Sequence, residues 1–170
     1  KLDKVVIRSS LMSAVEVTGL ALLIVTSATA FSQVLSLTGA ASGLAEFATN
    51  LPVSPWIILV SMQVVMLIMG LFIDEISIML ITIPIFFPVV SALGFDPTWF
   101  AIVTMVNMEI GVISPPFGLV LFVLKGVCPS DISLTDIFRG VMPFIVVNIA
   151  ALGLIMAFPF LATWLPNLMH

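Results

Sequence analysis

The sequence predicts an all-α integral membrane protein, because it is far more apolar than a soluble domain. Hydrophobic residues make up 61% of its 170 positions and charged residues 8%, against about 45–50% and about 25% in soluble proteins. Several apolar segments reach the roughly 20 residues that a membrane-spanning helix needs, without the alternation of barrel strands. We therefore expect a multi-pass helical protein in a lipid bilayer.

The residue types on which most enzymes depend are scarce in this sequence. Cys128 is its one cysteine and His170 its one histidine, which excludes an intrachain disulfide, a multi-histidine metal site and a histidine-based catalytic triad. No nucleophile and base form a recognisable pair. We expect no enzyme activity, no organic cofactor and no nucleic-acid partner.

The first apolar segment covers residues 10–37 and follows Lys1, Lys4 and Arg8. It is too long for a secretory signal, and the chain opens without an initiator methionine, so we expect a part of a longer sequence. Residues 40–50 form a short, mildly amphipathic segment that ends at a proline-containing turn. That segment is too short to span, and we expect it at an interface or between two units.

Residues 56–93 are apolar at both ends and interrupted at 70–77, where the sequence reads GLFIDEIS. The arms at 56–69 and 76–90 have about 14 or 15 residues each, which at about 1.5 Å per residue gives roughly 21 Å, less than the roughly 30 Å of the hydrocarbon core. They therefore fit a re-entrant hairpin better than two full spans.

A fourth apolar segment, residues 97–127, contains the stretch NMEIGVISPPFG near its middle. A polar stretch at 128–139 then leads to a final apolar helix, which we expect at 141–165. In lipid, backbone outside a helix costs several kcal/mol for each unpaired group unless it faces protein, ions or water. The interruptions at 70–77 and within NMEIGVISPPFG therefore indicate positions with a function.

Both interruptions combine a signal that ends one helix with a signal that starts another. Gly111 is expected to end the first half of the broken helix, and Ser114 and Pro115 to be the N-cap and first residue of the second half. At the hairpin tip, Gly70 and Asp74 are expected to act as C-cap and N-cap. Paired breaks of this kind let secondary transporters bind a cation at exposed carbonyls and an anion at helix N-termini.

Other interpretations of these residues remain open at this point. Each break could be a packing kink alone, and Asp74 could be a cap without being an ion ligand. Glu75 is more simply explained as a solvated loop residue. Glu109 lies near the middle of a membrane segment, which favours a functional or paired role, but no basic residue lies near it in the sequence.

The basic residues of the chain test the order of the membrane crossings. They are Lys1, Lys4, Arg8, Lys125 and Arg139. All five lie in the cytoplasm if the hairpin at 56–93 enters and returns on the outer side, in agreement with the positive-inside rule. A single crossing by that segment would place Lys125 and Arg139 outside, whereas two full crossings would not.

The stretch GLFIDEISIMLITIPIFFPVVSALGFDPTWFAIVTMVNMEIGVISPPFGLVLFV resembles the C-terminal half of the large membrane subunit, the DctM-like permease, of tripartite ATP-independent periplasmic (TRAP) transporters. The order and spacing of the family pattern agree from residue 70 to residue 118. That pattern has a G-x-x-x-D tip, a G-x-D-P turn, an Asn, an Ile-Gly and a Pro-Pro before a final Gly. The ending FPFLATWLP, residues 158–166, is also similar, and Ser114 stands where the family commonly has threonine.

The resemblance implies one inverted-repeat half of a sodium-coupled elevator-type transporter in the bacterial or archaeal inner membrane, with a re-entrant hairpin and a discontinuous transmembrane helix. It implies three protein partners, which are a missing N-terminal repeat of the same subunit, a small TRAP membrane subunit and a periplasmic solute-binding protein that delivers an organic-acid substrate. We expect residues 1–55 to form a scaffold helix and an interfacial connecting helix. Residues 56–127 would form the transport-domain half, with its hairpin at 56–93, and residues 128–170 a cytoplasmic connector and a C-terminal scaffold helix.

The residues expected at the transport site lie at or near the two breaks. The candidate ligands of the coupling Na⁺ are Gly70, Asp74, Gly111, Ile113 and Ser114. The candidate substrate contacts are Asn107, Ser114, Pro115 and Pro116. Two alternative functions remain, an inverted-repeat anion and sodium symporter without a binding protein and a non-transporting membrane assembly subunit.

Overall fold

The structure is a computed structural model, and it describes residues 4–116, 118–129 and 131–168. These residues form helices joined by short turns, in agreement with the all-α prediction. In chain order the helices are α1 (Lys4–Thr38), α2 (Ala40–Thr49), α3 (Pro55–Gly70), α4 (Glu75–Ala92), α5 (Pro97–Ile113), α6 (Leu119–Val127), α7 (Leu134–Ala157) and α8 (Phe160–Leu168).

Among the described residues, three helical stretches are long and apolar enough to cross a membrane. They are Val6–Thr38 within α1, Glu75–Ala92 (α4) and Leu134–Ala157 (α7). Large apolar side chains are exposed along these helices, among them Leu23, which is 64% exposed, and Phe144, which is 67% exposed. Such surfaces suit lipid or further protein rather than water, which agrees with the prediction of a multi-pass membrane protein.

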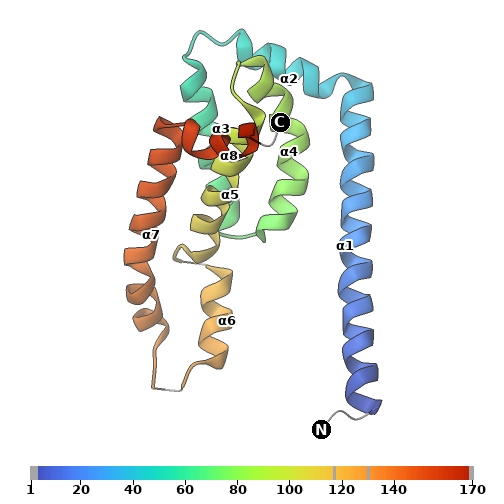
Figure 1. Cartoon of the computed structure of the whole chain (residues 1–170), viewed down its shortest axis with the longest axis vertical. Helices are drawn as coiled ribbons and strands as arrows, with labels where there is room; N and C mark the ends of the chain where they lie inside the picture. Colours follow the sequence, from blue (N-terminus) through green and yellow to red (C-terminus); the bar gives the residue numbers. More distant parts are fainter. Residues whose placement is uncertain (1–3, 117, 130, 169–170) are drawn as a thin grey trace.

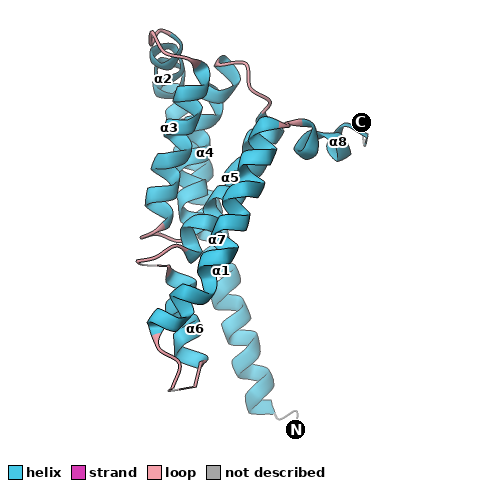
Figure 2. Cartoon of the chain, turned by 90° about the vertical axis from the view of Figure 1, so that its left-hand side faces the viewer, coloured by secondary structure: helices cyan, strands magenta, loops and turns pink. Residues whose placement is uncertain are grey.

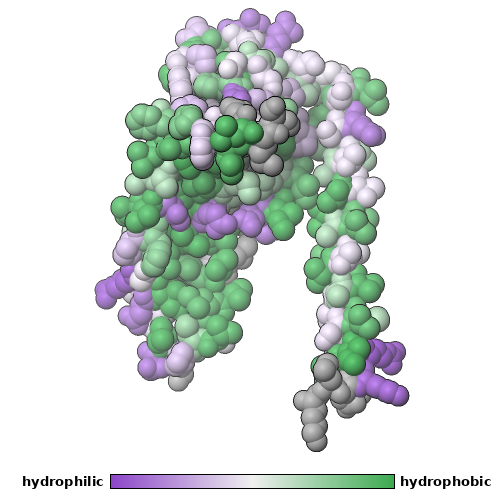
Figure 3. All heavy atoms as spheres, in the orientation of Figure 1, coloured by the Kyte–Doolittle hydropathy of each residue, from purple (hydrophilic) through white to green (hydrophobic). Residues whose placement is uncertain are grey.

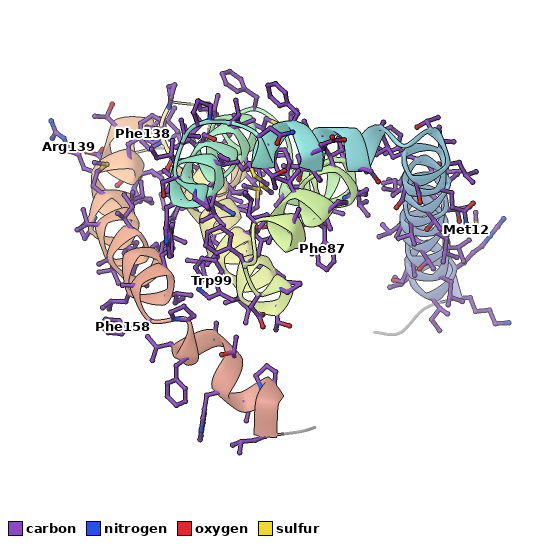
Figure 4. The ribbon with its side chains drawn as sticks, turned by 90° about the horizontal axis from the view of Figure 1, so that it is seen from above. Met12, Phe87, Trp99, Phe138, Arg139 and Phe158 are labelled. Carbon is purple, nitrogen blue, oxygen red and sulfur yellow. The ribbon has the colours of Figure 1, made fainter. Side chains whose placement is uncertain are left out.

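Figure 1 shows α1 running along the height of the molecule and standing to one side of the other helices. α2 lies across the top of that view, joins α1 to the other helices and packs against α4. Seen from above, α4 and α5 lie between α1 and α7 (Figure 4). α8 leaves the bundle to one side at its upper end (Figure 2).

α3 and α4 form a helical hairpin whose turn lies about midway along the height of α1 (Figure 1). α4 is longer than the arm predicted at 76–90, because the helix begins at Glu75 and continues to Ala92; Pro84 and Pro88 lie inside it. Its 18 residues correspond to about 27 Å, so length alone no longer separates a re-entrant hairpin from a crossing. The position of the turn is the feature that remains in favour of the hairpin.

The predicted broken helix is present as α5 and α6, with residues 114–118 outside both. The prediction that Gly111 ends the first half is wrong, because α5 continues to Ile113. Gly111 is not among the glycines with positive φ, which are Gly39, Gly94 and Gly118, so it does not have the left-handed conformation of a helix C-cap. It has another role, described below.

The C-terminal segment differs from the single helix predicted at 141–165. α7 begins earlier, at Leu134, because Ser133 and Asp136 form a reciprocal capping box. It ends at Ala157, and α8 starts at Phe160, after the two intervening residues Phe158 and Pro159. Phe158, the residue before Pro159, has the non-helical angles φ −126° and ψ 79°, and a proline ring disfavours the helical conformation of the residue that precedes it, which accounts for the break.

The main core lies between α3, α4 and α5 and includes the fully buried side chains of Leu59, Val90 and Phe100. Trp99 belongs to this core and is stacked on Phe95, with ring centroids 5.6 Å apart. Its indole Nε1 donates a hydrogen bond of 2.8 Å to the carbonyl of Ile155. This bond joins the first turn of α5 to the last turns of α7.

The basic residues in the described part of the chain gather at one end of the molecule. Lys4 and Arg8 lie in the first turns of α1, Lys125 in the last turn of α6, and Arg139 near the start of α7. These helix ends are all at the bottom of Figure 1, whereas α3 begins and α4 ends at the top. These four basic residues therefore lie at the end of the molecule opposite the open end of the hairpin, while their side of the membrane stays a prediction.

Candidate ion and substrate site

The fold brings the two predicted breaks together at Gly70 and Gly111. A Cβ built on Gly70 would lie 3.2 Å from the Cα of Gly111, and one built on Gly111 would lie 3.1 Å from the Cα of Gly70. These distances are shorter than ordinary van der Waals contact. α3 and α5 therefore cross backbone to backbone close to the points where each helix ends, and only glycine at both positions allows this approach.

The carbonyl groups at the two helix ends have different hydrogen-bond partners. At the end of α3, the carbonyl of Met69 accepts from the N–H groups of Phe72 and Ile73. At the end of α5, the carbonyl of Gly111 accepts from the N–H of Ser114 at 3.1 Å. A carbonyl oxygen has two lone pairs, so one such bond leaves it able to ligate a cation.

The carboxylate of Asp74 caps the second arm of the hairpin, as predicted. It is the N-cap of α4 and accepts a hydrogen bond of 2.9 Å from the backbone N–H of Ser77. Asp74 is exposed, and Glu75 is half-buried in the first turn of α4. Gly70 is the last helical residue of α3, one position before the C-cap Leu71, whose φ of −69° is right-handed.

Ser114 does not have the predicted role of N-cap for the second half-helix. It is the C-cap of α5, and its Oγ donates back to the carbonyl of Ile110. Pro115 and Pro116 lie in the turn that follows, not in the first turn of α6. The distance from Ser114 to Leu119, where α6 begins, is too long in sequence for a side-chain cap, which reaches only N2 or N3.

Gly118 is the N-cap of α6, a role that the sequence interpretation missed. Its φ is +20°, and a Cβ built on it would lie 3.0 Å from Cδ1 of Leu121 and 3.2 Å from the carbonyl oxygen of Ser114. Its own N–H donates to that carbonyl at 3.0 Å. A glycine placed directly before an apolar run, after two prolines, was the signal that could have identified it.

Asn107 is buried in the contact between α3 and α5, about one turn before Gly111. Its Nδ2 donates to the backbone carbonyl of Gln63 at 2.7 Å and to the side-chain Oε1 of Gln63 at 2.8 Å. Gln63 was not among the predicted residues. A glutamine in the otherwise apolar run MQVVM was the sign of a buried polar partner.

The polar residues of the hairpin and the break lie near the middle of the molecule. Figure 3 shows a band of hydrophilic residues across the bundle with apolar surface above and below it, at the height of the α3–α4 turn and the α5–α6 break in Figure 1. Within the described part of the chain, no three His, Cys, Asp or Glu side chains form a group that could hold a metal ion.

Comparison with known proteins gives consistent similarities along most of the chain. Residues 1–161 match the family described as the tripartite ATP-independent periplasmic transporter, DctM component. The chain is 35% identical over 159 residues to a C4-dicarboxylate TRAP transporter large permease protein of Rhodobacter capsulatus. The matched region makes up 94% of the chain and 36% of that protein. It is 30% identical over 161 residues to a sialic acid TRAP transporter permease protein of Haemophilus influenzae. That matched region makes up 95% of the chain and 26% of the Haemophilus protein.

A third relative is the 2,3-diketo-L-gulonate TRAP transporter large permease protein of Escherichia coli, with 30% identity over 137 residues, 81% of the chain and 32% of that protein. The chain thus spans between 26% and 36% of the length of these three relatives.

Proposed function

Because this chain belongs to the family of DctM components of tripartite ATP-independent periplasmic transporters, we propose that it is part of the large permease of an organic-acid carrier. The family consists of transport proteins and not enzymes. The three relatives are named for C4-dicarboxylates, sialic acid and 2,3-diketo-L-gulonate, which share a carboxylate group. We propose a carboxylate solute for this chain as well.

The backbone contact between Gly70 and Gly111 is the observation that supports this proposal most strongly. It places the end of α3 against the end of α5, each of which is followed by non-helical backbone. Helix C-termini carry partial negative charge and unpaired carbonyls, which attract a cation. Two such ends meeting inside one bundle form a cation site better than either end alone.

We propose that the cation is the coupling Na⁺ and that its ligands come from the residues around this contact. The candidates are Gly70, Asp74, Gly111, Ile113 and Ser114. The solute would lie at the turn of Ser114, Pro115 and Pro116, which leads into the N-terminus of α6, where unpaired N–H groups favour an anion. Asn107 would act from within the α3–α5 contact, because Gln63 holds its amide donors.

The proposed architecture is an inverted-repeat half of an elevator-type transporter, with α3 and α4 as a re-entrant hairpin. The hairpin turn midway along α1 (Figure 1) and the grouping of the basic residues at the opposite end support this arrangement. The cytoplasm would then be on the side of Lys4 and Lys125. The partners would be the other repeat of the permease, the small TRAP membrane subunit and a periplasmic solute-binding protein.

The test is sodium-dependent uptake of a panel of labelled organic acids by the complete transporter in proteoliposomes. The variant with Gly111→Leu, Pro115→Ala and Pro116→Ala removes the close contact and the prolines of the break, so we expect it to insert and assemble but to lose sodium-coupled uptake. Gly126→Ala is the matched control, because a Cβ there has nothing within 4 Å. Normal sodium affinity and uptake in the triple variant would show that the break is only a packing kink.

A second arm of the experiment uses this chain by itself. We expect it to insert into membranes without transporting, since half of the site would be missing. Sodium-dependent uptake by the isolated chain would contradict the inverted-repeat arrangement. Uptake that needs no binding protein would favour a symporter that takes its solute directly from solution.

A further inference from the structure

Three buried polar side chains connect α3 with α5 on the side of the Gly70–Gly111 contact towards the starts of these two helices, above that contact in the view of Figure 1. Gln63 is 5% exposed, Asn107 2% and Thr104 0%. Gln63 Nε2 donates to Thr104 Oγ1 at 3.0 Å, while Gln63 Oε1 accepts from Asn107 Nδ2 at 2.8 Å. Both ends of the Gln63 amide are thus occupied by α5, and we refer to Gln63, Thr104 and Asn107 as the polar clasp.

The surroundings of the polar clasp are apolar. Leu59 and Met66, one turn to either side of Gln63 on α3, are fully buried, as are Val103 and Met108 on α5. Apolar side chains would pack in this position without any need for directional bonds, and hydrogen bonds between helices in a membrane stabilise the helix pair only slightly. Stability alone is therefore a weak reason for three polar residues here, whereas fixing helix register is a known use of buried polar groups.

The spacing of the polar clasp matches that of the glycines. Seven residues separate Gln63 from Gly70 on α3, and seven separate Thr104 from Gly111 on α5. Seven residues are about two helical turns, so each polar residue lies on the same helix face as its glycine, about 10.5 Å away. If one helix slid by a turn, Gly70 would face a residue with a side chain, and the clasp bonds would break at the same time.

We propose that Gln63 and Thr104 are positioning residues that hold α3 and α5 in the one register in which Gly70 and Gly111 meet. Neither side chain needs to touch the ion or the solute. Their hydrogen bonds set the depth of the hairpin turn relative to the break between α5 and α6, so the two helix ends remain aligned. The inference rests on the proposed sodium-coupled function only where its test measures sodium-dependent uptake. The distance between α3 and α5 tests it independently of that function.

The test uses the complete transporter with two variants, Thr104→Val and Gln63→Met. Each removes polar atoms of the clasp while keeping a side chain of similar size. Thr104→Ser is the rescue variant, because it keeps the hydroxyl, and Met66→Leu is the packing control one turn away. The first readout is the distance distribution between spin labels at Ile68 and Met105, which are exposed residues of α3 and α5, in a background without other cysteines.

The second readout is the sodium concentration that gives half-maximal uptake. We expect Thr104→Val and Gln63→Met to broaden or shift the label distance and to raise this concentration about threefold to tenfold, as the loss of one or two such bonds predicts. Thr104→Ser and Met66→Leu should resemble the unaltered protein in both readouts. Unchanged label distances in both clasp variants would overturn the proposal, and so would equal effects of Met66→Leu.

The two readouts separate this inference from the proposed function. Uptake that shows no sodium dependence in the unaltered transporter contradicts the sodium coupling, while the label distances still test the register. If Gln63→Met fails to assemble, Thr104→Val alone tests whether the clasp holds the helix register. This substitution replaces the threonine hydroxyl with a methyl group and keeps the branched shape of the side chain. A normal label distance combined with weaker sodium affinity would mean that the clasp acts on the ion directly, which also contradicts a positioning role.

Discussion

Gly70 and Gly111 touch through their backbones, with each Cα 3.1 or 3.2 Å from the place that a Cβ on the other would occupy. A methyl group at either position would require the two backbones to move apart by a few tenths of an ångström, because the atoms opposite are main-chain atoms that cannot rotate away. We expect Gly70→Ala and Gly111→Ala to force α3 and α5 apart and to weaken sodium affinity at least about fivefold, in line with overpacked sites. The sodium affinity of each variant is measured as the sodium concentration that gives half-maximal uptake.

Gly153→Ala in α7 is the control for that pair of substitutions, since a Cβ there meets nothing within 4 Å. It should leave sodium affinity unchanged and stabilise the helix slightly, because alanine has the higher helix propensity. Equal losses in all three variants would mean that the close contact between the two helix ends has no special role.

Asp74 provides a test that separates helix capping from ion binding. The variant Asp74→Asn would retain an acceptor for the N–H of Ser77, and asparagine is as good an N-cap as aspartate, but the negative charge is lost. We expect this variant to keep its thermal stability and to need more sodium for half-maximal uptake. Asp74→Ala should lose about 0.5–2 kcal/mol of helix stability in addition. Normal sodium affinity in Asp74→Asn would restrict the residue to capping.

The turn between α5 and α6 should be more sensitive at Gly118 than at Ser114. Gly118→Ala introduces a Cβ 3.0 Å from the Leu121 side chain and 3.2 Å from the Ser114 carbonyl oxygen, at a φ of +20° that other residues rarely adopt. Ser114→Ala removes one hydrogen bond to the carbonyl of Ile110, which costs about 1 kcal/mol. We expect a large loss of uptake for Gly118→Ala and a mild one for Ser114→Ala, and the reverse order would contradict the geometry of the turn.

Glu109 points away from the contact between α3 and α5. It is exposed, whereas Gly111 is buried, and two residues along a helix correspond to a rotation of about 200°. We therefore expect Glu109→Gln to leave the half-saturating sodium concentration unchanged. A sharp rise in that concentration would show that the carboxylate belongs to the ion site, through contacts with other parts of the permease.

The membrane topology can be measured with cysteine labels. Ser54 precedes α3 and Ser91 lies at the end of α4, both exposed, while the native Cys128 follows α6 at the other end of the molecule. In a Cys128→Ser background, cysteines introduced at Ser54 and Ser91 should react with an impermeant reagent from the outer side. Cys128 in the unaltered chain should react from the inner side only. Labelling of the two hairpin ends from opposite sides would exclude the proposed hairpin.

Several elements could be predicted from the sequence because they depend on local chemistry. The apolar composition predicted membrane helices, and the aspartate at the hairpin tip, Asp74, predicted the N-cap that begins α4. Helix ends were less predictable. Gly111 has the residue type of a C-cap, yet α5 continues through it to Ile113, since a glycine also suits the close approach of another helix.

The sequence by itself determined the class of the protein and the chemical character of the interruptions after α3 and after α5, since these follow from hydropathy and from the backbone preferences of glycine and proline. Only the tertiary structure decided that the interruptions meet. The contact of Gly70 with Gly111 and the bonds of Gln63 to Thr104 and Asn107 join residues 41 to 44 positions apart in the sequence. Such pairings depend on how α3 and α5 pack, and helix packing is set by the shape of whole faces and not by the neighbours of one residue.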